Sequence, residues 1–279
     1  MSTDSPIVSA DWLKDNLHNP NLILLDASLA KPKTSPEENP LNGLQIPGSQ
    51  FFDINGQFSD TTIDLPHMMC DAVQFTNAAQ KLGINSDSQI VVYDNLGVYS
   101  SPRAWWMFRS MGHKRIKVLD GGLPEWAGAG NPTEPITELS FPPGNFTAQP
   151  LSGYFRDADY VLNAIENAKV LILDARSKGR FFGTEPEPRQ GLRGGHIPNS
   201  ESLPFPDVLA GTKMKSISEL EELFSEFDIG EKELVFSCGS GLTACIILLA
   251  ATRIGHDQSA VYDGSWSEWG QPSERPVIR

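Results

Sequence analysis

The stretch MGHKRIKVLDGGLPEW, residues 111–126, returns in altered form as IGHDQSAVYDGSWSEW, residues 254–269. Each copy carries a Gly-His pair near its start, runs through apolar residues to an Asp-Gly pair, and ends on Glu-Trp. The copies lie 143 positions apart, far beyond the reach of a local helix or strand pattern. An internal match of this length indicates one structural unit used twice. The sequence therefore predicts two related domains in tandem.

Three further pairs of segments keep the same order and nearly the same spacing. They are LLDAS (24–28) with ILDAR (172–176), 148 positions apart; IPGS (46–49) with IPNS (197–200), 151 apart; and IVVYD, ending at Asp94, with LVFSC, ending at Cys238, 144 apart. The segment between the copies is rich in Pro and Thr, which is typical of a linker. We therefore expect a first domain over residues 1–131, a linker over 132–151 and a second domain over 152–279.

The local patterns of both copies indicate an α/β fold. Unbroken apolar runs predict strands of a parallel sheet covered on both faces, at residues 21–27, 89–94, 116–122, 169–175, 233–238 and 259–265. Helix-type segments lie between them, at residues 72–84, 102–113, 158–168, 216–229 and 243–256. Alternation of strand and helix predicts parallel sheets flanked by helices, one in each domain.

Composition and charge exclude several classes of function. The 22 basic and 35 acidic side chains give a net charge of −13, which should repel nucleic acids and anionic membranes. The N-terminus lacks a secretion-signal pattern, and no apolar run is long enough to span a membrane. Three cysteines make no disulfide framework and suit a reducing compartment, so we expect a cytoplasmic protein.

The sequence CGSGLT, which follows the predicted strand 233–238, is the first candidate for chemistry. Its glycines permit turns in which backbone N–H groups face the Cys238 sulfur, and a helix is predicted to start near Thr243. Both features favour the nucleophilic thiolate over the thiol. The alternative is a small buried side chain at a tight turn. Because the first copy has Asp94 at this position, the fold itself does not need the cysteine.

The segment CGSGLTAC (238–245), the LPEW and SWSEWG ends, the GHIP turn and the two-copy layout resemble the rhodanese superfamily. Within it, the chain is similar to the 3-mercaptopyruvate sulfurtransferases over nearly its whole length. This resemblance implies an inactive first domain, a persulfide-forming Cys238 in the second, and no cofactor. It also implies a substrate site lined by the loop residues Gly239, Gly241, Leu242 and Thr243.

A basic cluster in this acidic chain is the candidate site for an anionic substrate. The residues 176–199 carry four arginines, Arg176, Arg180, Arg189 and Arg193, whose guanidinium groups can grip a carboxylate in bidentate fashion. The alternative is that Glu185 and Glu187 simply pair with them on the surface. The resembling family carries the motif GRFxGTEPEPR, which matches residues 179–189. This match implies that Arg180 and Arg189 bind the carboxylate of an α-keto acid.

A second polar loop, residues 49–69, lies in the first domain. Such a loop is usually just solvated, but in the resembling family it reaches the active cysteine of the other domain. Carried over residue by residue, the resemblance implies a relay of Asp53, His67 and Ser240, which could protonate the leaving enolate. Tyr99 matches a tyrosine near the family's pocket.

The predicted function is transfer of sulfur from 3-mercaptopyruvate through a Cys238 persulfide to a thiol such as thioredoxin, a small thiol or cyanide. A phosphatase is disfavoured because no basic residue occurs between Cys238 and Thr252 to grip phosphate. A thiosulfate:cyanide sulfurtransferase and a non-catalytic persulfide carrier or thiol-sensing module stay open as alternatives. We expect Cys245 to pack in a buried helix and Cys70 to be an inert thiol. The spacing of Cys238 and Cys245 is no metal signature.

Overall fold

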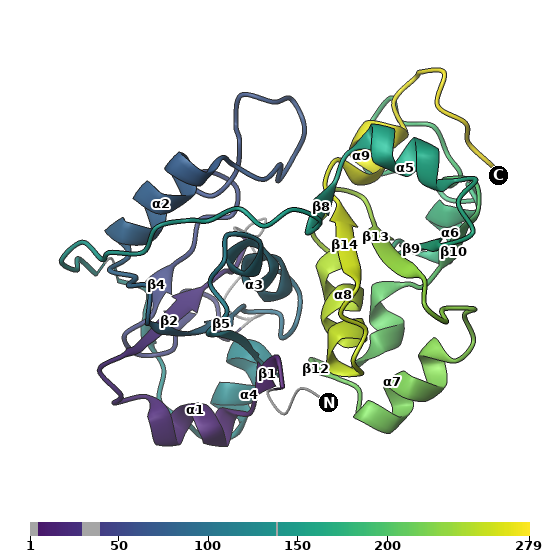
Figure 1. Cartoon of the computed structure of the whole chain (residues 1–279). Coiled ribbons are helices and arrows are strands. Elements are labelled where there is room, and N and C mark those ends of the chain that lie inside the picture. The colour runs from purple at the N-terminus through teal and green to yellow at the C-terminus, as the bar shows by residue number, and fades with distance from the viewer. Residues whose placement is uncertain (1–4, 30–39, 138) are drawn as a thin grey trace.

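The computed structural model describes residues 5–29, 40–137 and 139–279, which form two halves placed side by side (Figure 1). The first half is built on a five-stranded parallel sheet. In sheet order its strands are β1 (Ile7–Val8), β6 (Ile116–Leu119), β5 (Gln89–Tyr93), β2 (Leu22–Asp26) and β4 (Gln50–Phe51). Strands that run parallel require crossover connections, which helices of this half supply.

The second half repeats this sheet strand for strand. Its order is β8 (Phe155–Arg156), β14 (Ser259–Tyr262), β13 (Glu233–Ser237), β9 (Val170–Asp174) and β10 (Ser200–Ser202), again all parallel. In both sheets the first strand of the half lies at one edge, beside the last strand. The predicted fold class, two tandem α/β domains with parallel sheets flanked by helices, is confirmed.

The six strands predicted from apolar runs are the long strands of the two sheets, β2, β5, β6, β9, β13 and β14. The edge strands β1, β4, β8 and β10 were not predicted. Each has only two or three residues, too few for an apolar run or an alternating pattern to stand out.

Helices cover both faces of each sheet. In the first half, α1 (Ala10–Asn16) and α4 (Gly122–Gly128) pack on one face, and α2 (Ala72–Lys81) and α3 (Ser101–Ser110) on the other. In the second half, the corresponding pairs are α5 (Ala158–Ala164) with α9 (Ser265–Trp269), and α7 (Ile217–Phe224) with α8 (Ala244–Arg253). A further short helix, α6 (Lys178–Phe181), follows β9.

The helices α3 and α8 meet at the centre of the molecule, where the two halves join (Figure 1). Residues 244–251 of α8 are all buried, as expected of a helix whose sequence is apolar on every side. One hydrophobic core cluster continues from the first half through these helices into the second. The two domains therefore share a core and form one compact unit around their junction.

Local capping explains where several helices begin. The side chains of Asp71 and Asp157 accept hydrogen bonds from the first turns of α2 and α5. Ser216 and Glu219 form a reciprocal capping box at the start of α7. The helix α8 begins directly after Thr243, as predicted, and Thr243 provides no side-chain cap.

The segment 132–151, expected as a linker, lies along the first half. Its strand β7 (Glu134–Pro135) pairs with β3 (Leu44–Gln45), and Phe146 is buried in the core of the first half. A second small hairpin joins β11 (Leu209–Ala210) to β12 (Lys213–Met214) after the 3-10 turn η1 (Phe205–Val208). Of the helices in the described ranges, none has the length and apolar character that a membrane crossing requires.

Candidate active site

The Cys238 loop connects the end of β13 to the start of α8, at the carboxyl edge of the second sheet. Cys238 is buried, and the backbone N–H of Ser240 donates to its sulfur at 3.5 Å. Gly241 has a φ of +72°, and a side chain there would also collide with the carbonyl oxygen of Asp263. The loop therefore turns tightly enough to direct backbone N–H toward sulfur only with glycine at this position.

The helix α9 fixes the Cys238 loop through hydrogen bonds to its backbone. The backbone N–H of Trp266 donates to the carbonyl of Cys238, and that of Ser267 to the carbonyl of Gly239, both at 2.9 Å. The hydroxyl of Ser265 accepts the N–H of Cys238. Because α9 takes up these carbonyl oxygens, they do not face the sulfur.

Sequence reasoning missed the serines of α9, although the duplication contained a signal for them. Aligned at the offset of 143, Ser265 and Ser267 correspond to Gly122 and Pro124 of the first copy. They differ between the copies just as Cys238 does. The comparison that singled out the cysteine could therefore have singled out both serines.

Two of the four clustered arginines lie against the Cys238 loop. A Cβ placed on Gly239 would lie 3.0 Å from Nη2 of Arg180 and 3.7 Å from Nη1 of Arg189. Both guanidinium groups therefore stand over the residue that follows Cys238. Their positive charges can hold an anion within reach of the sulfur.

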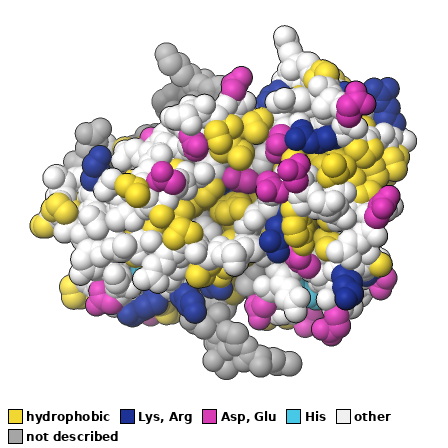
Figure 2. Space-filling model, turned by 45° about the horizontal axis from the view of Figure 1, so that its top comes forward, with side chains coloured by type: hydrophobic (Ala, Val, Ile, Leu, Met, Phe, Trp, Pro, Cys, Tyr) yellow, Lys and Arg dark blue, Asp and Glu magenta, His cyan; other side chains and the backbone are white. Residues whose placement is uncertain are grey.

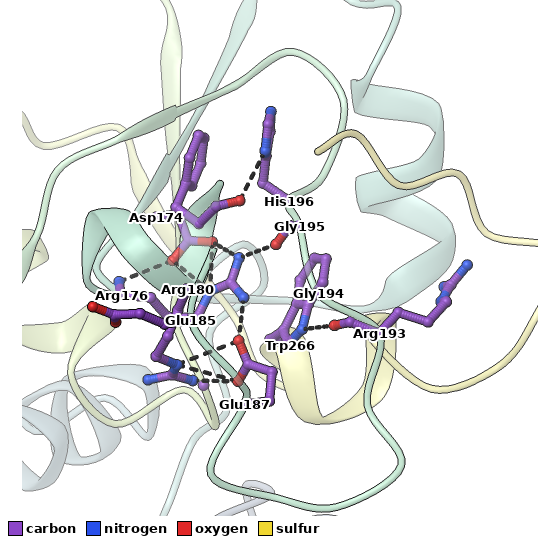
Figure 3. A network of polar contacts seen from close by, with 12 residues as sticks. Asp174, Arg176, Arg180, Glu185, Glu187, Arg193, Gly194, Gly195, His196 and Trp266 are labelled. Carbon is purple, nitrogen blue, oxygen red and sulfur yellow. Dashed lines mark hydrogen bonds and ion pairs between the residues drawn. The ribbon is translucent and has the colours of Figure 1, made fainter. Parts of the chain in front are cut away.

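The side chain of Glu187 fixes Arg180 in place (Figure 3). Its carboxylate accepts from Nη2 of Arg180 at 2.6 Å and from Nη1 of Arg176 at 2.8 Å. Arg176 itself is buried, pairs with Asp174 and lies over the Trp266 ring. Glu187 thus pairs with Arg176 and Arg180 as the alternative expected, but its side chain and that of Arg176 are buried and not on the surface, and Glu185 accepts from Ser177 instead.

The other two arginines of the cluster, Arg193 and Arg189, differ in their hydrogen-bond partners. Arg193 donates to the carbonyl oxygens of Trp269 and Arg275 and so ties down the C-terminal segment. Arg189 is exposed, and it forms no hydrogen bond or ion pair with any residue in the described part of the chain. It is the arginine of this cluster that is most free to bind an incoming anion.

His67, from the first half, reaches the Cys238 loop of the second. Its Nδ1 lies 3.0 Å from the hydroxyl oxygen of Ser240 and 3.3 Å from the Ser240 carbonyl. Burial, and then the charge of Arg103, lowers the pKa of His67 to about 4. The imidazole is therefore neutral at neutral pH, and it can exchange a hydrogen bond with the Ser240 hydroxyl.

A buried ion pair holds the backbone around His67. Arg103 of α3 donates to the carbonyl of His67, and it pairs with Asp263 at 2.7 Å. Asp263 also accepts the N–H of Met69 at 2.7 Å. His67 has a φ of +63°, unfavourable for a residue with a side chain, so these contacts stabilise a strained conformation.

Asp53, expected in a relay with His67, lies in a turn of its own loop. Its carboxylate accepts the N–H of Gly56 at 3.0 Å and that of Gln57 at 3.2 Å. Within the described ranges, no hydrogen bond joins Asp53 to His67. The structure thus brings His67 and Ser240 together directly, whereas Asp53 contacts the backbone of the loop that carries His67.

Tyr99 lies near the site as well. Burial, and then the proximity of Cys238, raises the pKa of its hydroxyl.

The other two cysteines, Cys70 and Cys245, are buried. Burial raises the pKa of both Cys70 and Cys245 to about 12, and the Cys245 thiol donates to the carbonyl of Gly241. Both thiols therefore stay protonated at neutral pH.

In the first half, the N–H groups of the loop equivalent to the Cys238 loop donate to a carboxylate of the same loop. Asp94 is fully buried and accepts the backbone N–H groups of Leu96, Tyr99, Ser100 and Ser101 at 2.9–3.0 Å. The Ser101 hydroxyl donates to it too. A carboxylate thus fills the ring of N–H donors, and the loop has no room for an external anion.

An open cleft of about 780 Å³ lies beside the site at the junction of the two halves. Residues 63–66 of the first half line one side, and residues 189–192 with Ser267 line the other. On the face shown in Figure 2, carboxylates are scattered and Lys and Arg lie in small separate groups. An anion approaching this acidic surface therefore depends on local arginines.

Within the described ranges, no group of three or more His, Cys, Asp or Glu side chains is placed to hold a metal ion.

Comparisons with known proteins extend the similarity over both halves. A model of the rhodanese-like domain matches residues 9–129 and again 157–272. Thiosulfate/3-mercaptopyruvate sulfurtransferase 1, mitochondrial, of Arabidopsis thaliana is 38% identical, over 99% of this chain and 79% of the relative. The 3-mercaptopyruvate sulfurtransferase of Homo sapiens is 40% identical, over 94% of this chain and 91% of the relative. The crystal structure of SseA from Escherichia coli, described among the 3-mercaptopyruvate sulfotransferases, superposes with a TM-score of 0.83 at 34% identity. The match covers 95% of this chain and 100% of SseA. The resemblance drawn from the loop motifs is confirmed.

Proposed function

Since the chain belongs to the rhodanese family, we propose that it transfers the sulfur of 3-mercaptopyruvate to a thiol or cyanide through a persulfide on Cys238. The observation that carries this proposal is the position of two guanidinium groups over Gly239, beside a cysteine that receives a backbone N–H. In this proposal residues 1–131 form the inactive domain, 132–151 the connection and 152–279 the catalytic domain.

In the first step, the Cys238 thiolate attacks the sulfur of 3-mercaptopyruvate. A sulfur–sulfur bond forms, the carbon–sulfur bond of the substrate breaks, and its electron pair passes to the enolate of pyruvate. Arg189 and Arg180 hold the substrate carboxylate. Loop residues 239–243 surround the transferred sulfur, and Tyr99 lines the site. The N–H of Ser240 stabilises negative charge on sulfur.

The enolate then needs a proton to leave as pyruvate. The Ser240 hydroxyl delivers this proton, and the neutral His67 ring, whose Nδ1 lies 3.0 Å away, returns one to it while its Nε2 takes up a proton from water. Asp53 supports this relay through the turn that it stabilises, because its carboxylate contacts Gly56 and Gln57. In the relay, Asp53 is therefore a positioning residue.

In the second step, an acceptor removes the outer sulfur of the persulfide. A thiolate, from a protein such as thioredoxin or from a small thiol, attacks that sulfur and regenerates the Cys238 thiolate. Cyanide attacks in the same way and leaves as thiocyanate. The cleft between residues 63–66 and 189–192 gives an acceptor access beside the site.

Thiosulfate is the second candidate donor. The name of the Arabidopsis relative includes both donors, and a pair of guanidinium groups suits a dianion as well as a carboxylate. A persulfide carrier would use the same intermediate without rapid turnover.

Steady-state kinetics with both donors test the proposal. We expect kcat/KM to be larger for 3-mercaptopyruvate, and the Arg180→Ala variant to lower it more for this donor than for thiosulfate. The reverse preference would favour the thiosulfate enzyme. Slow turnover with both donors, together with tight binding to one protein, would favour the carrier.

A further inference from the structure

Ser265, the first residue of α9, spans the base of the Cys238 loop. Its hydroxyl oxygen accepts the N–H of Cys238 at 3.2 Å and that of Gly241 at 3.0 Å. The same hydroxyl donates to the carbonyl of Tyr262 at 2.8 Å, and the side chain is fully buried. One hydroxyl group therefore ties both ends of the tight turn to the sheet beneath it.

The backbone at this position does not explain why the residue is serine. Ser265 has a φ of +47°, in the left-handed region that favours glycine. The equivalent residue of the first half is Gly122, which has a φ of +53°. The fold thus accepts glycine at this position without strain, and the serine is retained at a conformational cost.

The first half needs no such hydroxyl. A Cβ on Gly122 would lie 2.3 Å from the carbonyl oxygen of Asp94, so this loop sits closer to its helix. The Asp94 carboxylate binds the N–H groups of its own loop. The half without a nucleophile therefore lacks both the cysteine and the serine, whereas the half with one has both.

We propose that Ser265 is a positioning residue for sulfur transfer, and that its hydroxyl sets the direction in which the Cys238 sulfur faces the loop. Because the N–H groups of Cys238 and Gly241 are tied down to Ser265, the N–H of Ser240 between them points to the sulfur. This inference rests on the proposed persulfide chemistry at Cys238.

Two variants separate the hydroxyl from the backbone. Ser265→Gly removes the hydroxyl and relieves the strain of the positive φ, whereas Ser265→Ala removes the hydroxyl and keeps the strain. The control is Ser237→Ala, because Ser237 is an equally buried serine directly before Cys238 whose hydroxyl has no hydrogen-bond partner among the described residues. Rapid-quench mass spectrometry after addition of 3-mercaptopyruvate gives both the rate and the final yield of persulfide.

We expect persulfide formation to slow by about ten-fold or more in both Ser265 variants, since small misplacements of reacting groups cost this much. The final yield should stay near one per chain, and KM should change by less than about three-fold, because Arg180 and Arg189 are untouched. Ser237→Ala should keep the wild-type rate. The Gly variant should melt at a higher temperature than the Ala variant.

A Ser265→Gly protein with the wild-type rate would overturn the inference while leaving the proposed function intact. A lower yield at an unchanged rate would overturn it too, because that is the behaviour of a residue needed only for folding. Wild-type protein that forms no persulfide would overturn the proposed function, and the inference with it.

Discussion

The three cysteines of this chain have the same side chain but different surroundings. Burial raises the pKa of Cys70 and Cys245 to about 12, which keeps both thiols protonated and unreactive at neutral pH. Cys238 is also buried, but it receives a backbone N–H, and two guanidinium groups lie over the next residue. The three thiols therefore differ in their contacts and not in their exposure.

Arg189 offers a direct test of carboxylate binding, because it has no partner in the described ranges whose loss would confuse the result. We expect Arg189→Ala to raise KM for 3-mercaptopyruvate about ten-fold, the loss of one charge-assisted hydrogen bond, with a smaller effect on kcat. Lys178→Ala is the control, since it removes the same charge from an exposed residue nearby. Equal effects of the two changes would show that only overall charge matters.

His67 predicts a pH dependence of folding stability. Its pKa in the folded protein is about 4, below the ordinary value of 6.5, so the folded state favours the neutral ring. Between these values the unfolded chain binds a proton that the folded chain does not, and stability falls as the pH falls. From pH 6.5 to about pH 4.5, wild type should lose on the order of 2 kcal/mol more than His67→Gln. Urea unfolding at both pH values measures this, and equal losses would contradict the assignment.

At the scale of elements, the two copies of one loop have taken different roles. In the second half, the turn between β13 and α8 directs an N–H toward a sulfur. In the first half, the turn between β5 and α3 directs four N–H groups toward the Asp94 carboxylate. The same strand-turn-helix unit thus binds an internal carboxylate in one copy and directs an N–H toward a cysteine sulfur in the other.

Removal of the internal anion should affect stability far more than chemistry. In Asp94→Ala, four N–H groups lose their acceptor, and the buried ones of Ser100 and Ser101 cost about 1–3 kcal/mol each if they find no other partner. We expect a melting temperature lower by several degrees, a smaller loss in Asp94→Asn, and an unchanged rate of persulfide formation on Cys238. Calorimetry together with the persulfide assay checks both parts. An Asp94→Ala protein as stable as wild type would show that the N–H groups are solvated.

The sequence predicted the elements that carry long patterns and missed those that depend on neighbours in space. The six long strands and the helices α2, α3, α5, α7 and α8 followed from apolar runs and their alternation, whereas the shorter helices α1, α4, α6 and α9 were not predicted. Cys238 was singled out because Asp94 replaces it, whereas Arg180 and Arg189 followed from a family motif. Ser265 could have been found by comparing the copies. The hydrogen bond from Met69, next to His67, to Asp263 could not have been found in this way, since it joins residues almost 200 positions apart.

At the scale of the whole molecule, the two halves exchange equivalent contacts across their junction. The N–H of Met69 in the first half donates to Asp263, and the N–H of Met214 in the second donates to Asp120. Asp120 and Asp263 are 143 positions apart, the offset of the repeat. The interface is therefore nearly symmetric, and of the two contacts it is the one at Asp263 that lies next to the Cys238 loop.

This near symmetry provides a matched pair of variants. Asp263→Asn breaks the buried ion pair with Arg103, and loss of one partner of such a pair costs about 3–5 kcal/mol. It also loosens the segment that holds His67 beside Ser240. We expect kcat for pyruvate release to fall about ten-fold or more, whereas Asp120→Asn should weaken the junction but keep kcat. Equal kcat values in the two variants would mean that the Asp263 contact acts only on stability.

In the proposed reaction, sulfur passes through Cys238 alone. Mass spectrometry of the protein after addition of 3-mercaptopyruvate tests it most directly, with the Cys238→Ser variant as control. We expect one added sulfur atom on the peptide that contains Cys238, none on the peptide of Cys70, none located on Cys245, and none in the variant. Sulfur on another cysteine, or sulfur transfer retained by Cys238→Ser, would contradict it.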